Sequence, residues 1–451
     1  MSKYHTSDIS IIIIGICLWL LSGCSANNEK SSESEQSNGT FISEMNAALT
    51  EAVIIDLFSP PVASRIYVYP NIAAYEILQN SSVKFNTMKG ILVGLDDLPL
   101  PSKDANIDLA VASLVAFVKV GKELVYTEAG LLKFESHKLD SLQSTGINEE
   151  VFSESIKFGN KVAEKILKWA NDDSYVETRS AERYSLLNTD GSWLPTPPDY
   201  TPAMEPHWDQ IRTFVIPNAA VYLPDSLIEF STDPLSEFYS LNKEVYEAVN
   251  IAESDQIVMA KFWDDNPVVT EHKGHMKIKN KKMTPGGHWV AITSYAVRDY
   301  NLDMPSAAYS FAMTSIALAD AFISCWDAKY HFQTIRPVTY INDHISSDWQ
   351  PILQTPPFPE YPSGHSAISA SAATVLTHMF GDNFAFVDSS ETPFDLPVRS
   401  FNSFNHAAEE VALSRYYGGI HYKISNQVGV DMGVKVGNEV IKKLTVVTFT
   451  R

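Results

Sequence analysis

Hydrophobic residues along most of the chain recur every three or four positions, the spacing that places them on one face of an α-helix. One such series is formed by Phe152, Ile156, Gly159, Ala163, Ile166 and Trp169. Residues 107–120 and 307–323 are apolar on nearly every side, which is typical of helices buried among other helices. Long alternating runs of Val, Ile and Thr, typical of strands, are absent from the sequence. The pattern predicts an all-α protein.

The N-terminus departs from this helical pattern. An apolar run over residues 9–21 is short for a bilayer span and is followed at once by Ser-Gly-Cys24. It resembles a bacterial lipoprotein signal, so residues 1–23 are predicted to be a signal peptide and Cys24 to be lipidated. This predicts an exported protein, lipid-anchored to the outer membrane and facing the periplasm or the cell surface. A plain membrane-anchor helix is the alternative.

The remaining chain divides by composition. Residues 24–40 are rich in Ser, Glu and Asn and are predicted to be a disordered tether. Residues 41–451 are predicted to form the helical domain, with an N-terminal half over 41–225 and a C-terminal half over 226–451. This length suffices for a large buried core.

The net charge narrows the choice of partners. The formal charge is -20 at pH 7 and the sequence pI is about 5.0. Such an acidic surface argues against nucleic acid or anionic lipid as a partner. Any anion site in this protein must therefore concentrate positive charge locally, so clustered Arg and Lys residues are informative.

One helix start has the features of an anion site. Residues 358–369 read Phe-Pro-Glu-Tyr-Pro-Ser-Gly-His-Ser-Ala-Ile-Ser, and a buried helix is predicted over residues 366–380. The first N–H groups of a helix lack internal partners, and the helix dipole makes that end positive. Ser363 adds a hydroxyl, Gly364 permits close approach and His365 can act as an acid or base. A helix cap followed by a packed histidine is the alternative.

Two further segments supply cations. Lys329 and Arg336 are seven residues apart, so they lie on one face if the preceding buried helix continues, and Pro337 is predicted to end that helix at Arg336. Buried cations are costly unless an anion or carboxylate meets them. Salt bridges to Asp320 and Asp327 are the alternative.

The last segment carries a third cation and a second histidine. Gly418 and Gly419 are predicted to break the helix between Arg415 and His421, which lets both side chains converge on one point. A glycine helix stop with a surface arginine is the alternative interpretation. Taken together, the three segments predict one oxyanion site.

The three segments, within residues 326–421, resemble the shared signature of vanadium-dependent haloperoxidases and type 2 phosphatidic acid phosphatases. Weaker likeness to bacterial haloperoxidases extends to residues 59–65, 262–267 and 285–289. The resemblance implies two helical bundles packed together, as in vanadium chloroperoxidase, and vanadate as cofactor. Relatives usually carry Asp four residues after the final histidine, whereas this chain has Ser425. The residue that orients His421 is therefore expected to be missing or replaced.

The resemblance also assigns roles. His421 would bind the vanadium, His365 would move protons when hydrogen peroxide enters, and Lys329 would polarise the peroxide. The remaining contacts to the vanadate oxygens would come from Arg336, Ser363, Gly364 and Arg415, together with Lys329. In the phosphatase alternative, a phosphomonoesterase, His421 would attack phosphorus and His365 would protonate the leaving group.

Two aromatic residues favour the haloperoxidase. Trp326 shares a helix face with Lys329, and Phe358 lies in the loop before Ser363; both match positions that line the halide side in haloperoxidases. Plain core packing is the alternative for both. The size, leader and outer segments are most similar to bacterial iodoperoxidases of marine flavobacteria, so iodide is the expected halide. A non-catalytic surface lipoprotein that retains the fold is a minor alternative.

Overall fold

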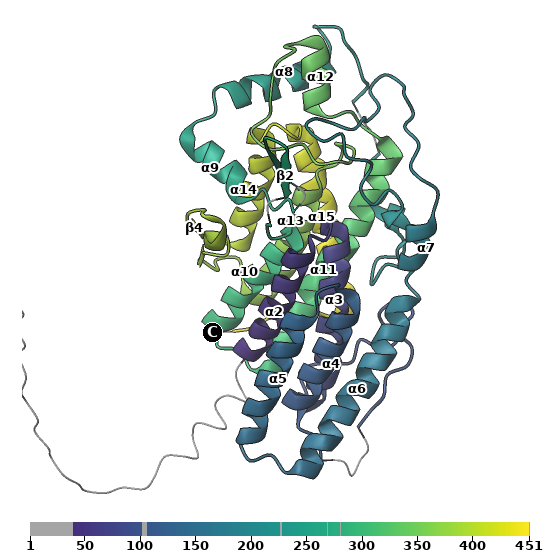
Figure 1. The fold of residues 1–451 in the computed structure, drawn as a ribbon, viewed down its shortest axis with the longest axis vertical. Helices are drawn as coiled ribbons and strands as arrows, with labels where there is room; N and C mark the ends of the chain where they lie inside the picture. The colour runs from purple at the N-terminus through teal and green to yellow at the C-terminus, as the bar shows by residue number, and fades with distance from the viewer. Residues whose placement is uncertain (1–38, 102–105, 226–227, 268, 280, 451) are drawn as a thin grey trace, which may run out of the picture.

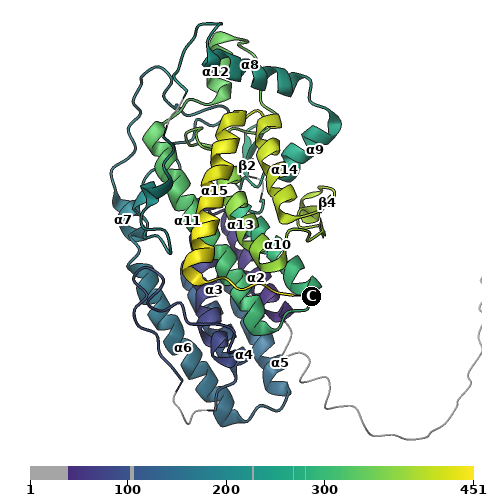
Figure 2. The same cartoon turned by 180° about the vertical axis from the view of Figure 1, so that it is seen from behind.

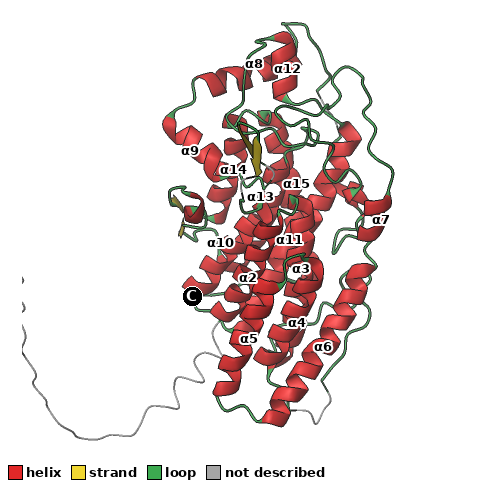
Figure 3. Cartoon of the chain, in the orientation of Figure 1, coloured by secondary structure: helices red, strands yellow, loops and turns green. Residues whose placement is uncertain are grey.

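The computed structural model describes residues 39–101, 106–225, 228–267, 269–279 and 281–450. Within these ranges nearly all of the regular secondary structure is helical, with two short two-stranded sheets, which confirms the all-α prediction (Figure 3). Cys24, the predicted signal peptide and nearly all of the predicted tether lie outside the described residues. The first helix begins at Thr40, the last residue of that tether.

The helices of the N-terminal half form one end of an elongated molecule (Figure 1). They are α2 (Thr40–Asp56), α3 (Pro60–Leu78), α4 (Leu109–Leu124), α5 (Ala129–Ser144) and α6 (Glu149–Asn171). Helix α4 packs against α3, α5 and α6. The periodic series predicted from Phe152 to Trp169 lies in α6, and the all-apolar residues 107–120 lie mostly in α4, so both predicted helices are confirmed.

The helices of the C-terminal half form a second bundle. They are α10 (Pro285–Asp299), α11 (Met304–Phe332), α13 (Gly364–Phe380), α14 (Phe404–Tyr417) and α15 (Lys423–Leu444). Helices α13 and α15 pack along each other, as Figure 2 shows. Helix α11 contacts α3 on one side and α13 on the other, so it joins the two bundles. It is apolar and long enough to cross a membrane, but its most apolar stretch is entirely buried inside the fold.

Shorter helices, 3-10 turns and strands connect the long helices of the two bundles. The helices are α7 (Tyr175–Ser180), α8 (Glu237–Asn250), α9 (Ser254–Phe262) and α12 (Pro337–His344), with the 3-10 turns η1 (Gln79–Ser81), η2 (Trp208–Gln210), η3 (Ala219–Tyr222) and η4 (Thr392–Phe394). Strand β1 (Thr270–Lys273) pairs antiparallel with β2 (Met276–Lys279), and β3 (Phe386–Asp388) with β4 (Arg399–Phe401).

The middle of α11 is held by a buried carboxylate. Asp320 accepts hydrogen bonds from the backbone N–H groups of Phe214, Val215 and Ile216 at 2.7, 2.8 and 3.1 Å. Burial raises the pKa of Asp320 to about 6, and these three bonds oppose the rise. Asp320 therefore anchors the preceding loop, and the suggested Asp320 salt bridge to Lys329 is wrong.

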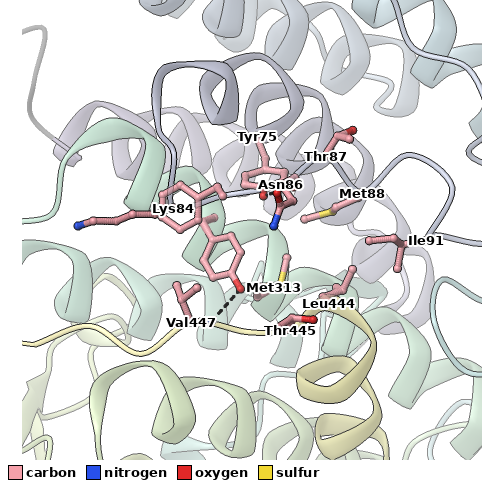
Figure 4. Close-up of a pocket in the computed structure, with 12 residues that line it drawn as sticks. Tyr75, Lys84, Asn86, Thr87, Met88, Ile91, Met313, Leu444, Thr445 and Val447 are labelled. Atoms are coloured by element: carbon pink, nitrogen blue, oxygen red, sulfur yellow. Dashed lines mark hydrogen bonds between the residues drawn. The ribbon is translucent and has the colours of Figure 1, made fainter.

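A small cavity of about 60 Å³ lies away from the predicted site, where the loop of Lys84–Met88 meets the chain after α15 (Figure 4). Its wall includes Tyr309, whose hydroxyl accepts a hydrogen bond from the backbone N–H of Val447 at 3.0 Å. None of the predicted site residues lines this cavity.

Candidate anion-binding active site

The chain brings all three predicted segments to one buried place. Lys329 comes from the last turn of α11, Arg336 precedes α12, Ser363 caps α13, Arg415 lies in the last turn of α14, and His421 lies just before α15. Lys329, Arg336 and Ser363 are 0% exposed, Arg415 is 1% exposed and His421 is 2% exposed. All five side chains therefore lie in the interior of the protein and not on its surface.

The backbone between Lys329 and Arg336 is not the continuous helix that the sequence predicts. Helix α11 ends at Phe332, and Gln333 follows in the left-handed conformation with φ of 51°. Arg336 is extended, with φ of -83° and ψ of 149°, as the residue before a proline prefers. Pro337 starts α12 and does not end α11. The two cations therefore converge from different elements.

The Lys329 ammonium is held by backbone carbonyls. Its Nζ donates to the carbonyl oxygens of Pro359 and Glu360, both at 2.9 Å. Burial lowers the pKa of Lys329, and the nearby Arg336 guanidinium lowers it further. The loop before Ser363 therefore fixes this ammonium group.

The Arg336 guanidinium is only partly satisfied. Nε donates to the carbonyl of Phe358 at 2.8 Å, and Nη1 donates to the carbonyl of Ile420 at 2.8 Å. Its Nη2 is buried and has no hydrogen-bond partner among the described residues. Burial lowers the pKa of Arg336 to about 10, so the side chain remains a cation at neutral pH. A buried, unpaired guanidinium nitrogen requires an acceptor that the protein does not provide.

Arg415 is the third cation. Nε donates to Ser414 Oγ at 3.0 Å and Nη2 donates to the carbonyl of Ala260 at 3.1 Å. Burial lowers the pKa of Arg415 to about 10, while the charges of Asp264 and Asp265 oppose that change. Helix α14 ends at Tyr417, and Gly418 and Gly419 follow, with φ of 78° at Gly419, so the predicted helix break is confirmed.

His365, on the first turn of α13, has one nitrogen without a partner. Its ring forms a hydrogen bond with the backbone of Asp264, while Nε2 is buried and unpaired among the described residues. Burial and the charge of Arg415 lower the pKa of His365 well below its usual value. The ring is therefore neutral in this state and can accept or donate a proton.

The contacts of His421 define its tautomer. Nε2 lies 3.3 Å from Arg336 Nη1, and a guanidinium can only donate. Nε2 is therefore the unprotonated nitrogen, and burial with the adjacent cations lowers the pKa of His421 well below its usual value. Nδ1 consequently carries the proton and donates it to Glu360 Oε1 at 2.7 Å. This leaves the Nε2 lone pair available as a metal ligand or nucleophile.

Glu360 is a functional residue that the sequence analysis missed. Besides His421, its carboxylate accepts from Ser425 Oγ at 2.7 Å and from the backbone N–H of Tyr422 at 3.1 Å. Burial raises the pKa of Glu360, while Arg336 and the Ser425 hydroxyl lower it. The sequence does contain a signal for it, because Glu360 is an acidic residue in the loop of residues 358–363, and this loop is predicted to form part of the site.

Two aromatic rings and a glycine shape the space beside the cations. The rings of Trp326 and Phe358 lie 5.0 Å apart, and the Arg336 guanidinium carbon is 4.9 Å from the Phe358 ring centre. A Cβ added to Gly364 would lie 3.2 Å from the Trp326 ring and 3.6 Å from Lys329 Cε. A side chain at position 364 would therefore crowd the space between the tryptophan and the lysine.

Comparison with known proteins supports this geometry. The family described as VCPO second helical-bundle domain matches residues 309–448, which contain the whole site. The crystal structure of the first bacterial vanadium-dependent iodoperoxidase is 42% identical, with a TM-score of 0.85, covering 92% of this chain and 98% of that chain. The chain belongs to the vanadium-dependent haloperoxidase family.

More distant members of the fold are also similar. A holo-type bacterial vanadium-dependent chloroperoxidase is 14% identical over 86% of this chain and 93% of that chain, with a TM-score of 0.62. An apo-type bacterial vanadium-dependent chloroperoxidase is 16% identical over 87% and 96%, with a TM-score of 0.64. A comparison with curated protein sequences gives no match. At these identities the chloroperoxidases share the fold with the present chain.

The position four residues after His421, where the family resemblance implies an aspartate, is Ser425 in this chain. Its hydroxyl donates to Glu360, which in turn holds His421. The carboxylate that holds His421 thus comes from the loop before α13 and not from the start of α15. The partner of His421 is therefore replaced, by Glu360, and is not missing.

The haloperoxidase site has the cations and unpaired polar atoms that an oxyanion would need. Its three cations donate to backbone carbonyls or a hydroxyl, and none forms an ion pair with a carboxylate of the described residues. The unpaired atoms Arg336 Nη2 and His365 Nε2 supply a donor and a proton-exchanging nitrogen. This excess of buried positive charge matches vanadate, a phosphate-like anion that accepts one further ligand.

Proposed function

We propose that this chain is a vanadium-dependent haloperoxidase that uses hydrogen peroxide to oxidise halide, with iodide preferred, to hypohalous acid. The observation that carries the proposal is the set of three buried cations, none of which forms an ion pair with a carboxylate of the described residues, together with the unpaired nitrogens Arg336 Nη2 and His365 Nε2. A plain structural core would satisfy these groups internally. The identity to a bacterial iodoperoxidase supports the choice of chemistry.

Each side chain takes a role that follows from its contacts. His421 Nε2, unprotonated, would ligate vanadium, while Lys329, Arg336 and Arg415 would neutralise the oxygens. Ser363 and the N–H of Gly364 would add hydrogen bonds at the positive end of α13. Bound vanadate supplies a Lewis acid that activates hydrogen peroxide toward halide.

His365 is the proton carrier in this proposal. Its lowered pKa keeps the ring neutral, so Nε2 can take a proton from incoming hydrogen peroxide and return it to the departing oxygen. The hydrogen bond with the backbone of Asp264 holds the ring in place. Lys329, fixed by two carbonyls, would place its positive charge beside the peroxide.

A reconstitution assay tests the function. The full chain is stripped of bound anion and given vanadate or phosphate, and peroxide-dependent triiodide formation is measured beside phosphomonoester hydrolysis. We expect vanadate alone to restore iodide oxidation, in proportion to bound vanadium. If the protein hydrolysed phosphomonoesters without vanadate and formed no triiodide with vanadate, the result would favour a phosphomonoesterase that uses the same anion-binding residues.

The halide choice depends on Phe358. Because its ring contacts Trp326 and lies close to two cations, Phe358→His is expected to change the ratio of iodide to bromide turnover while vanadate affinity stays nearly unchanged. Phe358→Leu, which removes the ring without adding a polar group, is the control. Steady-state kinetics with both halides measure the ratio, and an unchanged ratio would exclude Phe358 from the halide side.

We also propose that the chain is exported and lipidated at Cys24, on the basis of the Leu-Ser-Gly-Cys sequence. Cys24→Ala is expected to release the protein from the membrane or to leave an unprocessed precursor. Mass spectrometry of the mature N-terminus measures the modification, with Cys325→Ala as the control because Cys325 is buried inside the fold. An unmodified N-terminus at another residue would reject this proposal.

A further inference from the structure

A second buried group of titratable side chains lies outside the anion site. It comprises Asp265 after α9, His288 in the first turns of α10, Asp388 at the end of β3, and Glu391 just before η4. Their exposures are 2%, 1%, 0% and 1%, respectively. The peroxidase chemistry proposed above makes no use of them. We call these four residues the carboxylate–histidine cluster.

On the Asp388 side of the cluster, both carboxylate oxygens have hydrogen-bond donors. His288 Nε2 lies 2.8 Å from Asp388 Oδ2, while Asp388 Oδ1 accepts from the backbone N–H and hydroxyl of Ser390 at 2.9 and 2.7 Å. The Tyr295 hydroxyl adds a longer bond at 3.3 Å. Asp388 is therefore satisfied as a carboxylate, and His288 Nε2 is the nitrogen that donates a proton to it.

The other side of the cluster is incomplete. His288 Nδ1 forms a hydrogen bond shared between both Asp265 oxygens, at 3.2 and 3.1 Å, but lies 3.9 Å from Glu391 Oε1, which is beyond hydrogen-bond distance. Glu391 Oε1 is buried and has no hydrogen-bond partner among the described residues. A buried carboxylate oxygen without a donor is costly unless a cation meets it. The unsatisfied oxygen thus points to a missing positive ligand.

We propose that His288 Nδ1, Asp265 and Glu391 bind one divalent transition-metal ion, for which Zn²⁺ is the best match. Their ligand atoms lie within 4.8 Å of one another. Two ligands at Zn²⁺ distances of about 2.0–2.2 Å in tetrahedral geometry are separated by about 3.3–3.6 Å. The distances of 3.1 and 3.2 Å from Nδ1 to Asp265 are close to this range, and Glu391 Oε1, 3.9 Å from Nδ1, would move closer on binding.

The surrounding contacts agree with such a site. A metal-bound histidine usually donates its other N–H to a carboxylate, and Asp388 holds that position here. Two carboxylates balance the charge of the ion, whereas without it three acidic groups face a single imidazole. A cavity of about 460 Å³ is lined in part by Tyr295, Ser389 and Ser390, which neighbour the cluster in the structure or the sequence.

The ion would stabilise the fold around the anion site by linking separate segments of the chain. It would join the loop that follows α9 to the β3–η4 segment and to α10. Asp264, next to the ligand Asp265, holds the His365 ring through its backbone. The ion is therefore a structural support for the segment that positions His365, and it takes no part in peroxide chemistry.

Metal analysis of the full chain tests this site. Vanadate-loaded protein is dialysed against zinc-containing, then metal-free buffer, and its zinc content is measured by mass spectrometry together with its thermal unfolding midpoint. We expect about one zinc per chain and a higher Tm in zinc. Glu391→Gln, which keeps the shape, and His288→Gln should both lose the ion and the rise in Tm. His275→Ala, which removes an exposed histidine, is the control and should keep both.

Three outcomes would overturn the inference. One is a zinc-free protein whose Tm does not change with Zn²⁺ or Mn²⁺. Another is zinc that Glu391→Gln retains, since the ion would then lie elsewhere. The third is stabilisation by Ca²⁺ or Mg²⁺ alone, which would indicate an oxygen-only site without His288. Glu391→Gln removes repulsion in the metal-free cluster, so it is expected to fold and to remain informative if His288→Gln does not.

Discussion

Replacing His365 with alanine is expected to lower iodide oxidation by about 10²–10⁴-fold while vanadate still binds, because general acid–base catalysis typically contributes this much. The variant keeps Lys329, Arg336, Arg415 and the His421 ligand. It removes only the neutral ring whose Nε2 is unpaired in the site. The loss should appear mainly at low hydrogen peroxide concentration, because proton removal from the peroxide is the impaired step.

His421→Ala is expected to fail differently. It removes the unprotonated Nε2 and the proton that Nδ1 gives to Glu360, so vanadate would lose the nitrogen that is proposed to ligate it. Activity should disappear at low vanadate and return in part at high vanadate. Titrating both variants with vanadate while following triiodide formation and bound vanadium separates the two effects. Normal vanadate binding by His421→Ala, with none by His365→Ala, would show that the two roles are reversed.

The helices of this protein were predictable because their signals are local. The spacing of apolar residues in α6 and the all-apolar surface of α11 each follow from a short stretch of sequence. The end of α11 was misplaced because Gln333 has no helix-breaking signature, whereas Pro337 has a strong one. Gln333 instead adopts the left-handed conformation, its N–H bonded to the carbonyl of Lys329.

The convergence of the cations was predicted from motifs, but the partner of His421 was not. The family resemblance implies an orienting aspartate four residues after the histidine, where this chain has Ser425. The structure supplies that carboxylate from Glu360, which is distant in sequence. Such a swap depends on how the loop before α13 packs against the start of α15. Periodicity and spacing contain no information on that contact.

The role of Glu360 leads to a second large effect. Glu360→Ala is expected to weaken vanadate binding by about 10–100-fold, the usual cost of losing a residue that orients a metal ligand. The change leaves His421 Nδ1–H and the Ser425 hydroxyl without their acceptor in a buried site. It also removes the negative charge that raises the basicity of His421. Equilibrium dialysis with vanadate, read as vanadium per chain, measures the affinity independently of turnover.

A second substitution distinguishes orientation of His421 from general stability. Ser425 Oγ lies 2.7 Å from Glu360 Oε2, so Ser425→Asp would bring a carboxylate near the one that Glu360→Ala removes. The double variant is expected to recover most of the vanadate affinity, because it restores the arrangement usual among relatives. Ser425→Asp alone is the control, and it should bind more weakly than wild type because two carboxylates then compete for one imidazole. If Glu360→Ala bound vanadate normally, or the double variant recovered stability without affinity, Glu360 would have only a structural role.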